Sequence, residues 1–252
     1  MPENVRRTLK LTIQYDGTEY VGWQRQANGV SVQGLLEQAL RPIAGAHVDV
    51  FGAGRTDAGV HALGQVASCR LTLAIPPQRL VRALNAVLPR DIRVVDAEDV
   101  PGDFHARFSA TGKVYEYRII NDQAVSPFLR RFVWHVIPAL DLDAMREASA
   151  LLLGRHDFAA FQAVRATVRS TERTIRRLDW IEGTGNDEPW RMQIEGDGFL
   201  RHMVRTITGT LVQIGLRRWP VEYVTQILAS RSRISAGTTA PPAGLFLMRV
   251  LY

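Results

Sequence analysis

The chain has 252 residues, of which 46% are hydrophobic, and it carries a formal charge of +6 with a pI of about 10.0. This composition supports a substantial core and argues against disorder, and the positive charge favours a polyanion such as nucleic acid as the partner. Because no apolar run could span a bilayer and the opening MPENVRRTLK lacks the apolar core of a signal peptide, we expect a cytoplasmic protein without membrane contact.

Arginine supplies almost all of the positive charge, since the only lysines are Lys10 and Lys113 against 29 arginines. Guanidinium groups suit bidentate phosphate contacts and stacking on bases, although an arginine bias can also reflect genomic base composition. The single cysteine, Cys69, lies in an alternating apolar run. An internal disulfide is therefore excluded, and a buried structural thiol is expected.

Apolar periodicity predicts an α+β chain in which helices are mixed with mostly antiparallel strands. In the first half we expect, in order, a strand at 8–15, a helix at 33–43, strands at 47–54 and 64–73, a helix at 77–88 and a strand at 91–98. In the second half we expect a strand at 114–120, a helix at 142–154, strands at 172–182 and 189–196, helices at 199–216 and 221–230, and a strand at 244–252.

These patterns suggest two halves, 1–105 and 106–252, that share a sheet. Asp141 is the expected N-cap of the helix that follows it, and Gly154 its expected end. The segment 155–171 is the least regular. Its arginines, with Arg173 just beyond, could form a solvated edge or a phosphate-binding lip: Arg165, Arg169 and Arg173.

A glycine-rich loop with charged residues lies between two strand-like runs, in the stretch FGAGRTDAGVHALGQ at 51–65. Glycines give the backbone freedom for a tight path or for the close approach of a ligand. Taken alone, the ordinary interpretation is that Asp57 caps a turn and Arg55 is solvated.

The string GRTDAGVHA resembles the catalytic signature of the pseudouridine synthases, and in particular the TruA family of tRNA pseudouridine synthases. Other segments resemble that family in the same order along nearly the whole chain: YDGTEYVGWQRQ with SVQGLLEQAL, FHARFSATGKVYEYRI, GRHDFAAF, FLRHMVRTITGTLVQIG and APPAGLFLMRVLY. The resemblance implies the pseudouridine synthase fold: two RNA-recognition-motif-like halves share a central, mostly antiparallel sheet, with the active-site cleft between them.

The resemblance also assigns roles to five residues. Asp57 would be the essential carboxylate, and Arg205 the guanidinium that keeps it ionised against burial. Tyr115 would stack on the extruded uracil and is a candidate proton acceptor, with Leu245 on the other side of the pocket. Arg55 would fill the gap left by the flipped nucleotide or hold a phosphate. From pattern alone, the ordinary interpretation of Arg205 is a surface arginine on an amphipathic helix and that of Leu245 is a core residue, whereas Tyr115 fits a core position or a site equally well.

The implied reaction converts uridine to pseudouridine at positions 38, 39 and 40 of the tRNA anticodon stem-loop, in a homodimer. It breaks the bond from C1′ to N1 and rejoins the base through C5, so no cofactor and no metal is expected. The sequence has no phosphate loop of the GxxxxGK[ST] type, no cysteine pair and no HExxH, and its six histidines are scattered.

Three alternatives for Asp57 stay open: attack on C6, attack on C1′, and proton abstraction from the ribose to give a glycal. Two rival functions also remain. A non-catalytic RNA-binding protein on the same scaffold would have no use for a carboxylate that faces phosphates. A hydrolase that pairs Asp57 with a histidine would release uracil instead of an isomer.

Overall fold

The computed structural model describes residues 7–164, 168–185 and 187–252, and the chain divides into two compact units. The first unit consists of the residues up to Thr111 together with Leu247–Tyr252, and the second is Gly112–Phe246. The halves suggested by the sequence, 1–105 and 106–252, differ from these units in the residues that follow 105 and in the last strand. Arg165 lies outside the described residues.

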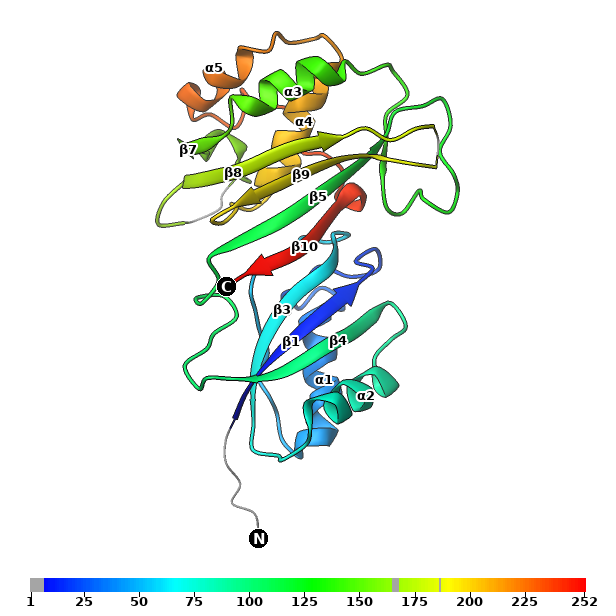
Figure 1. Cartoon of the computed structure of the whole chain (residues 1–252), viewed down its shortest axis with the longest axis vertical. Coiled ribbons are helices and arrows are strands. Elements are labelled where there is room, and N and C mark those ends of the chain that lie inside the picture. Colours follow the sequence, from blue (N-terminus) through cyan, green and yellow to red (C-terminus); the bar gives the residue numbers. More distant parts are fainter. Residues whose placement is uncertain (1–6, 165–167, 186) are drawn as a thin grey trace. The chain divides into compact units, whose positions relative to one another are not determined.

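The first unit packs two helices against antiparallel strands (Figure 1). Its elements are β1 (Arg7–Tyr15), α1 (Val32–Ala44), β2 (Phe51–Gly52), β3 (His61–Leu71), α2 (Pro77–Val87), β4 (Ile92–Val100) and most of β10 (Leu245–Leu251). Strand β1 lies between β3 and β4 and is antiparallel to both, and β10 follows β3 in the strand order.

The core of this unit follows from alternation along β1. Leu9, Leu11 and Ile13 are fully buried, as expected for the inward face of a strand whose side chains alternate. Helix α1 begins after Ser31, whose hydroxyl accepts a hydrogen bond from the Gly34 N–H at 3.2 Å, a standard N-cap. The buried residues of each helix form an apolar stripe, with Leu36 and Leu40 in α1 and Leu80 and Leu84 in α2.

The second unit repeats this plan with more helices, which gather on one side of its strands (Figure 1). Its elements are β5 (Gly112–Ile120), β6 (Trp134–His135), α3 (Leu142–Ala150), β7 (Gly154–Asp157), η1 (Ala159–Phe161), β8 (Glu172–Ile181), β9 (Trp190–Gly196), α4 (Met203–Gly215), α5 (Tyr223–Ser230) and η2 (Pro242–Gly244). The order is β5-β9-β8-β7 with antiparallel pairing throughout, and β6 runs parallel to β5.

The predicted α+β class is confirmed, with mostly antiparallel strands in both units. Cys69 is buried in β3, as expected, and burial raises the pKa of its thiol to about 12. The Asp141 side chain accepts from the Ala144 N–H at 3.0 Å and so caps α3 as predicted. Within the described ranges, no helix has the length and apolar character needed to cross a membrane.

Several predicted bounds are wrong for local reasons. Helix α3 ends at Ala150, before Gly154, which instead opens β7 with a φ of +92°. Helix α4 begins at Met203 and not at 199, because His202 adopts the left-handed conformation at φ 65° and interrupts the helix. The strand expected at 47–54 is only the two-residue β2, and the short strands β6 and β7 were not expected.

A close backbone approach holds the segment that follows α5 against α4. A Cβ on Gly209, in the middle of α4, would lie 1.8 Å from the carbonyl oxygen of Thr238. At the next residue, the Gly237 N–H donates to the Thr210 hydroxyl at 3.0 Å. Only glycine fits at 209, so the helix and this segment lie closer together than side chains would allow.

We predict that Gly209→Ala destabilises the protein although alanine favours helices. The propensity gain of about 1 kcal/mol is opposed by a clash with main chain, and overpacking of this kind costs about 1–3 kcal/mol, so we expect a net loss in the free energy of unfolding. Urea denaturation measures it. Gly102→Ala is the control, because nothing lies within 4 Å of its Cβ position. Equal stability of the two variants would contradict the prediction.

Candidate active site

The main chain of the loop that carries Asp57 is anchored by a neighbouring loop. The Trp23 N–H donates to the Thr56 carbonyl at 3.1 Å, and within the loop the Val60 N–H donates to the Asp57 carbonyl at 3.2 Å. Gly22 makes the approach possible, since it has a φ of +104° and a Cβ there would lie 2.4 Å from the Thr56 oxygen. The backbone on either side of the carboxylate is therefore fixed.

A buried polar network formed by Tyr15 and Gln65 also holds the loop that carries Asp57. The Tyr15 hydroxyl and the Thr56 Oγ1 are 2.8 Å apart, and the Gln65 amide donates to the Gly54 carbonyl at 2.9 Å and to the Tyr15 oxygen at 3.4 Å. Burial raises the pKa of Tyr15 to about 12, which the hydrogen bonds to Thr56 and Gln65 partly oppose. In the same loop, Asp57 is half-buried and Arg55 is exposed.

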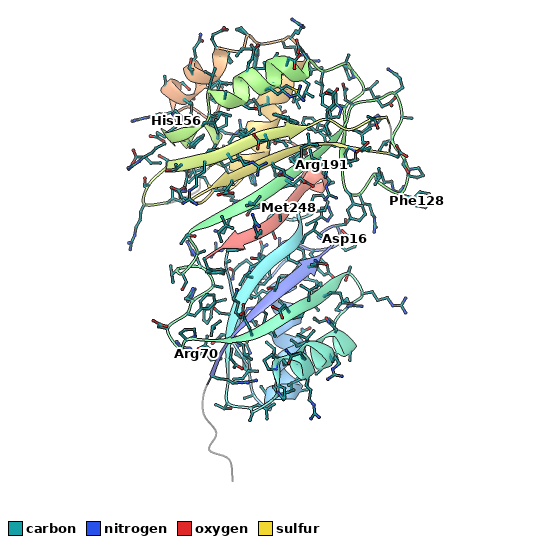
Figure 2. All side chains as sticks on the ribbon, in the orientation of Figure 1. Asp16, Arg70, Phe128, His156, Arg191 and Met248 are labelled. Carbon is teal, nitrogen blue, oxygen red and sulfur yellow. The ribbon has the colours of Figure 1, made fainter. Side chains whose placement is uncertain are left out.

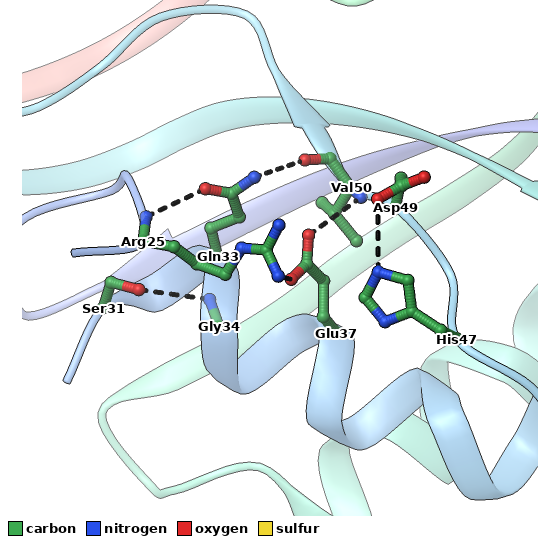
Figure 3. Close-up of polar contacts among 8 residues, drawn as sticks. All are labelled: Arg25, Ser31, Gln33, Gly34, Glu37, His47, Asp49 and Val50. Atoms are coloured by element: carbon green, nitrogen blue, oxygen red, sulfur yellow. Dashed lines mark hydrogen bonds and ion pairs between the residues drawn. The ribbon is translucent and has the colours of Figure 1, made fainter. Parts of the chain in front are cut away.

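The loop that supplies Gly22 and Trp23 is in turn held by α1 (Figure 3). The Glu37 side chain is only 4% exposed, and its carboxylate accepts from the Val50 N–H at 3.2 Å and pairs with Arg25 at 3.1 Å. The Gln33 amide bridges the same two segments, accepting from the Arg25 N–H at 3.0 Å and donating to the Val50 carbonyl at 3.0 Å. Because both carboxylate oxygens of Glu37 are used, this buried charge is satisfied.

His61, at the start of β3, contacts the turn that follows β1. Its Nδ1 lies 3.0 Å from the Gly17 N–H and 3.1 Å from the carboxylate of Asp16, which is at the end of β1 (Figure 2). A peptide N–H can only donate, so Nδ1 is the acceptor in the contact with Gly17, whereas the contact with the Asp16 carboxylate requires a proton on Nδ1. His61 therefore orders the turn after β1.

In the second unit, Arg205 is fixed by the segment after α5. Its Nε donates to the Ala240 carbonyl at 2.7 Å, and the Ala240 N–H donates to the Arg205 carbonyl at 3.1 Å. The next residue, Pro241, accepts from the Tyr117 hydroxyl at 2.7 Å. Burial holds the pKa of Tyr117 far above its usual value, with the charge of Arg205 acting against it, so Tyr117 keeps its proton and this hydrogen bond.

The other two candidates of this unit are buried at strand positions. Tyr115 is 7% exposed and meets Phe199 edge to face, with ring centroids 5.3 Å apart. Leu245 opens β10 directly after Gly244, where a Cβ would lie 2.7 Å from the Tyr117 ring. The second unit thus contains Tyr115, Arg205 and Leu245, while Arg55 and Asp57 belong to the first.

Sequence reasoning missed the supporting residues. The sequence offered a signal for Gln65, a polar residue in phase with the buried Cys69 and Leu71 of the same strand, but none for Glu37, which lies outside the apolar stripe of its helix. Among the residues that the structure describes, no three histidine, cysteine, aspartate or glutamate side chains form a group that could hold a metal ion.

Comparison with known proteins shows similarity to one family. A family model described as tRNA pseudouridine synthase matches residues 11–109 and 148–252. The chain is 49% identical to tRNA pseudouridine synthase A of Myxococcus xanthus, over 97% of this chain and 91% of that protein. Identity to the protein of the same name from Syntrophotalea carbinolica is 47%, over 97% and 96%, and from a Thermoanaerobacter species 45%, over 98% and 100%.

The chain belongs to the tRNA pseudouridine synthase family. The predicted family and its fold are confirmed by matches that cover almost the whole chain. Arg55, Asp57, Arg205 and Leu245 lie within the segments matched by the family model, and Tyr115 lies between them.

We predict that Tyr15 and Thr56 are energetically coupled. Tyr15→Phe and Thr56→Val should each lower the free energy of unfolding by about 1 kcal/mol, because each leaves a buried polar partner unsatisfied. A double-mutant cycle by urea denaturation should give a coupling energy of about 0.5–1.5 kcal/mol. Lys10→Ala with Glu98→Ala is the control for an exposed pair, 2.7 Å apart. Strict additivity at Tyr15 and Thr56 would contradict the network.

Stability should also fall at high pH. The pKa of Tyr15 rises from 10.0 to about 12 on folding, so the native state holds a proton that the unfolded chain loses in this window. Stability from this group is therefore present below pH 10 and decreases above it, by up to about 1.4 kcal/mol per pH unit. Denaturation at several alkaline pH values should show a shallower decrease for Tyr15→Phe than for the wild type.

Proposed function

We propose that this chain converts uridine to pseudouridine in the anticodon stem-loop of tRNA, at positions 38, 39 and 40, with Asp57 as the essential carboxylate. The observation that carries the proposal is family membership over nearly the whole chain, with the string GRTDAGVHA intact. The rigid support of the loop around Asp57 agrees with a catalytic carboxylate, because such a group has to be held in one orientation.

The reaction is an isomerisation, so its atoms balance without a co-reactant. The bond from ribose C1′ to uracil N1 breaks, the base turns, and C5 forms a new bond to C1′. The proton on C5 is lost, and N1 gains one. In this proposal Asp57 acts in its ionised form, as a nucleophile or as the electrostatic partner of a developing ribosyl cation, and the guanidinium of Arg205 favours that form.

The remaining candidates would hold the extruded nucleoside. Tyr115 would stack on the uracil and is the candidate proton acceptor, and Leu245 would pack on the other side of the base. Arg55 is exposed, as expected for a residue that replaces the flipped nucleotide or holds a phosphate. We further propose that the enzyme acts as a cytoplasmic homodimer on one tRNA, without metal or cofactor, as the family resemblance implies.

A non-catalytic RNA-binding protein is the main alternative. It predicts that the chain binds tRNA and leaves every uridine unchanged. A hydrolase predicts free uracil in place of an isomer of unchanged mass. Product analysis therefore separates all three functions in one experiment.

We predict that Asp57→Asn lowers conversion by more than about a thousandfold, as expected when a reacting group is lost, while tRNA binding changes less than about twofold. The assay is tritium release from tRNA labelled at C5 of uridine, with filter binding in parallel. The control is Asp143→Asn, whose side chain is 85% exposed in α3. Undiminished tritium release by Asp57→Asn would refute the role of this carboxylate.

A further inference from the structure

The second unit contains a pocket to which the proposed chemistry assigns no role. Its volume is about 510 Å³, and it opens where the segment before residue 165, the start of α4 and the loop after α5 meet. The described residues that line it are Ala163, Val164, Arg201, His202, Arg233, Ile234 and Thr239. Two arginines and a histidine thus line one cavity, and its described lining contains no carboxylate.

Arg233 is the unusual member of this lining. Its guanidinium donates to the Thr239 Oγ1 at 2.9 Å and to the Ala236 carbonyl at 3.4 Å, which are both neutral oxygens. Among the described residues no carboxylate lies within ion-pair distance of Arg233, and partial burial lowers its pKa. A partly desolvated cation without a counter-ion is unfavourable unless a ligand supplies the negative charge.

Arg231 in the same loop differs from Arg233 because it has an acidic partner. Arg231, two residues earlier, pairs with the Asp157 carboxylate at 3.0 Å, so its positive charge is compensated within the chain. Arg233 instead uses neutral acceptors that fix the orientation of its side chain and leave other N–H donors of the fork available. The loop therefore contains one satisfied guanidinium and one that is oriented toward a cavity.

The start of α4 adds to the positive potential of the pocket. His202 precedes the helix in a left-handed conformation, φ 65°, and its side chain makes no capping hydrogen bond. The first N–H groups of a 13-residue helix carry partial positive charge, which an anion at this end would complement. A left-handed non-glycine residue costs about 1–3 kcal/mol, and such residues concentrate at functional sites.

We propose that this pocket binds a backbone phosphate of the tRNA substrate, with Arg233 and Arg201 as its cations. The proposal rests on the proposed function, because that function supplies the polyanion. Val164 and Ile234, which are 71% and 95% exposed, flank the cations. A sugar and base on either side of the phosphate would cover these apolar side chains, whereas a free inorganic anion would leave them in water.

Arg233→Gln tests the proposal by its effect on affinity and on salt dependence. We expect the Kd for tRNA to rise roughly tenfold at low salt. The slope of log K against log[KCl] should become shallower by about 0.9, the value for one lost phosphate contact. Arg231→Gln is the matched control, for which we expect an unchanged slope. Arg233→Lys keeps the charge and should retain the slope of the wild type. If Arg233→Gln does not fold, Arg201→Gln is measured in its place, and an unchanged Kd and slope in that variant would equally overturn the proposal.

Each outcome decides the question. A Kd and slope equal to those of the wild type in folded Arg233→Gln would overturn the proposal, as would an equal change in Arg231→Gln. Thermal shift with inorganic phosphate alone tests the other source of the anion. Stabilisation by phosphate that requires Arg233, combined with unchanged tRNA binding, would identify a small-anion site and reject the RNA contact. Failure of the proposed function is separate, since it would appear as wild-type protein that binds tRNA without releasing tritium.

Discussion

The hydrogen bond from the Trp23 N–H to the Thr56 carbonyl is the contact on which the order of the first unit's site depends. It joins two loops that have no regular structure of their own, and Gly22 allows it by removing the Cβ that would block the approach. Buried side chains then fix each partner: Gln33 and Glu37 on α1 hold one loop, and Tyr15 with Gln65 holds the other. The main chain that carries the Asp57 carboxylate is thereby held in place.

In the second unit, too, a glycine allows two stretches of main chain to approach closely. Here Gly209 removes the Cβ, and the segment Thr238–Pro241 lies directly on α4, where it binds both the main chain and the guanidinium of Arg205. In both units, the candidate residue is held through backbone carbonyls that a glycine brings within reach. Sites built in this way tolerate substitution at the surface far better than at the glycines, because the glycines set the spacing between main chains.

Long periodic elements could be predicted from the sequence because one local pattern determines them. The alternation in β1 and the apolar stripe of α1 are examples, and the α+β class follows from them. The start of α4 could not be predicted, because helix-forming residues continue before it and only the left-handed His202 interrupts them. Strand β2 is short because only Phe51 and Gly52 pair with β3.

The candidate site residues were predicted from the family resemblance, whereas the residues that hold them in place could not be predicted from the sequence. The contact between Tyr15 and Thr56 joins residues 41 positions apart, and no local pattern specifies such a pair. Arg233 is another example. In the sequence it is one of 29 arginines, and it becomes distinct only when the structure pairs Arg231 with Asp157 and leaves neutral oxygens for Arg233.

The return of Leu247–Tyr252 to the first unit has a consequence for biosynthesis. A Cβ on Gly64 in β3 would lie 2.3 Å from the Met248 carbonyl, and the Tyr252 hydroxyl donates to Ala106, so this strand is an integral part of that unit. The ribosome makes it only after the entire second unit. The contiguous second unit therefore leaves the exit tunnel before the strand that packs against Gly64, and β3 lacks this neighbour until then.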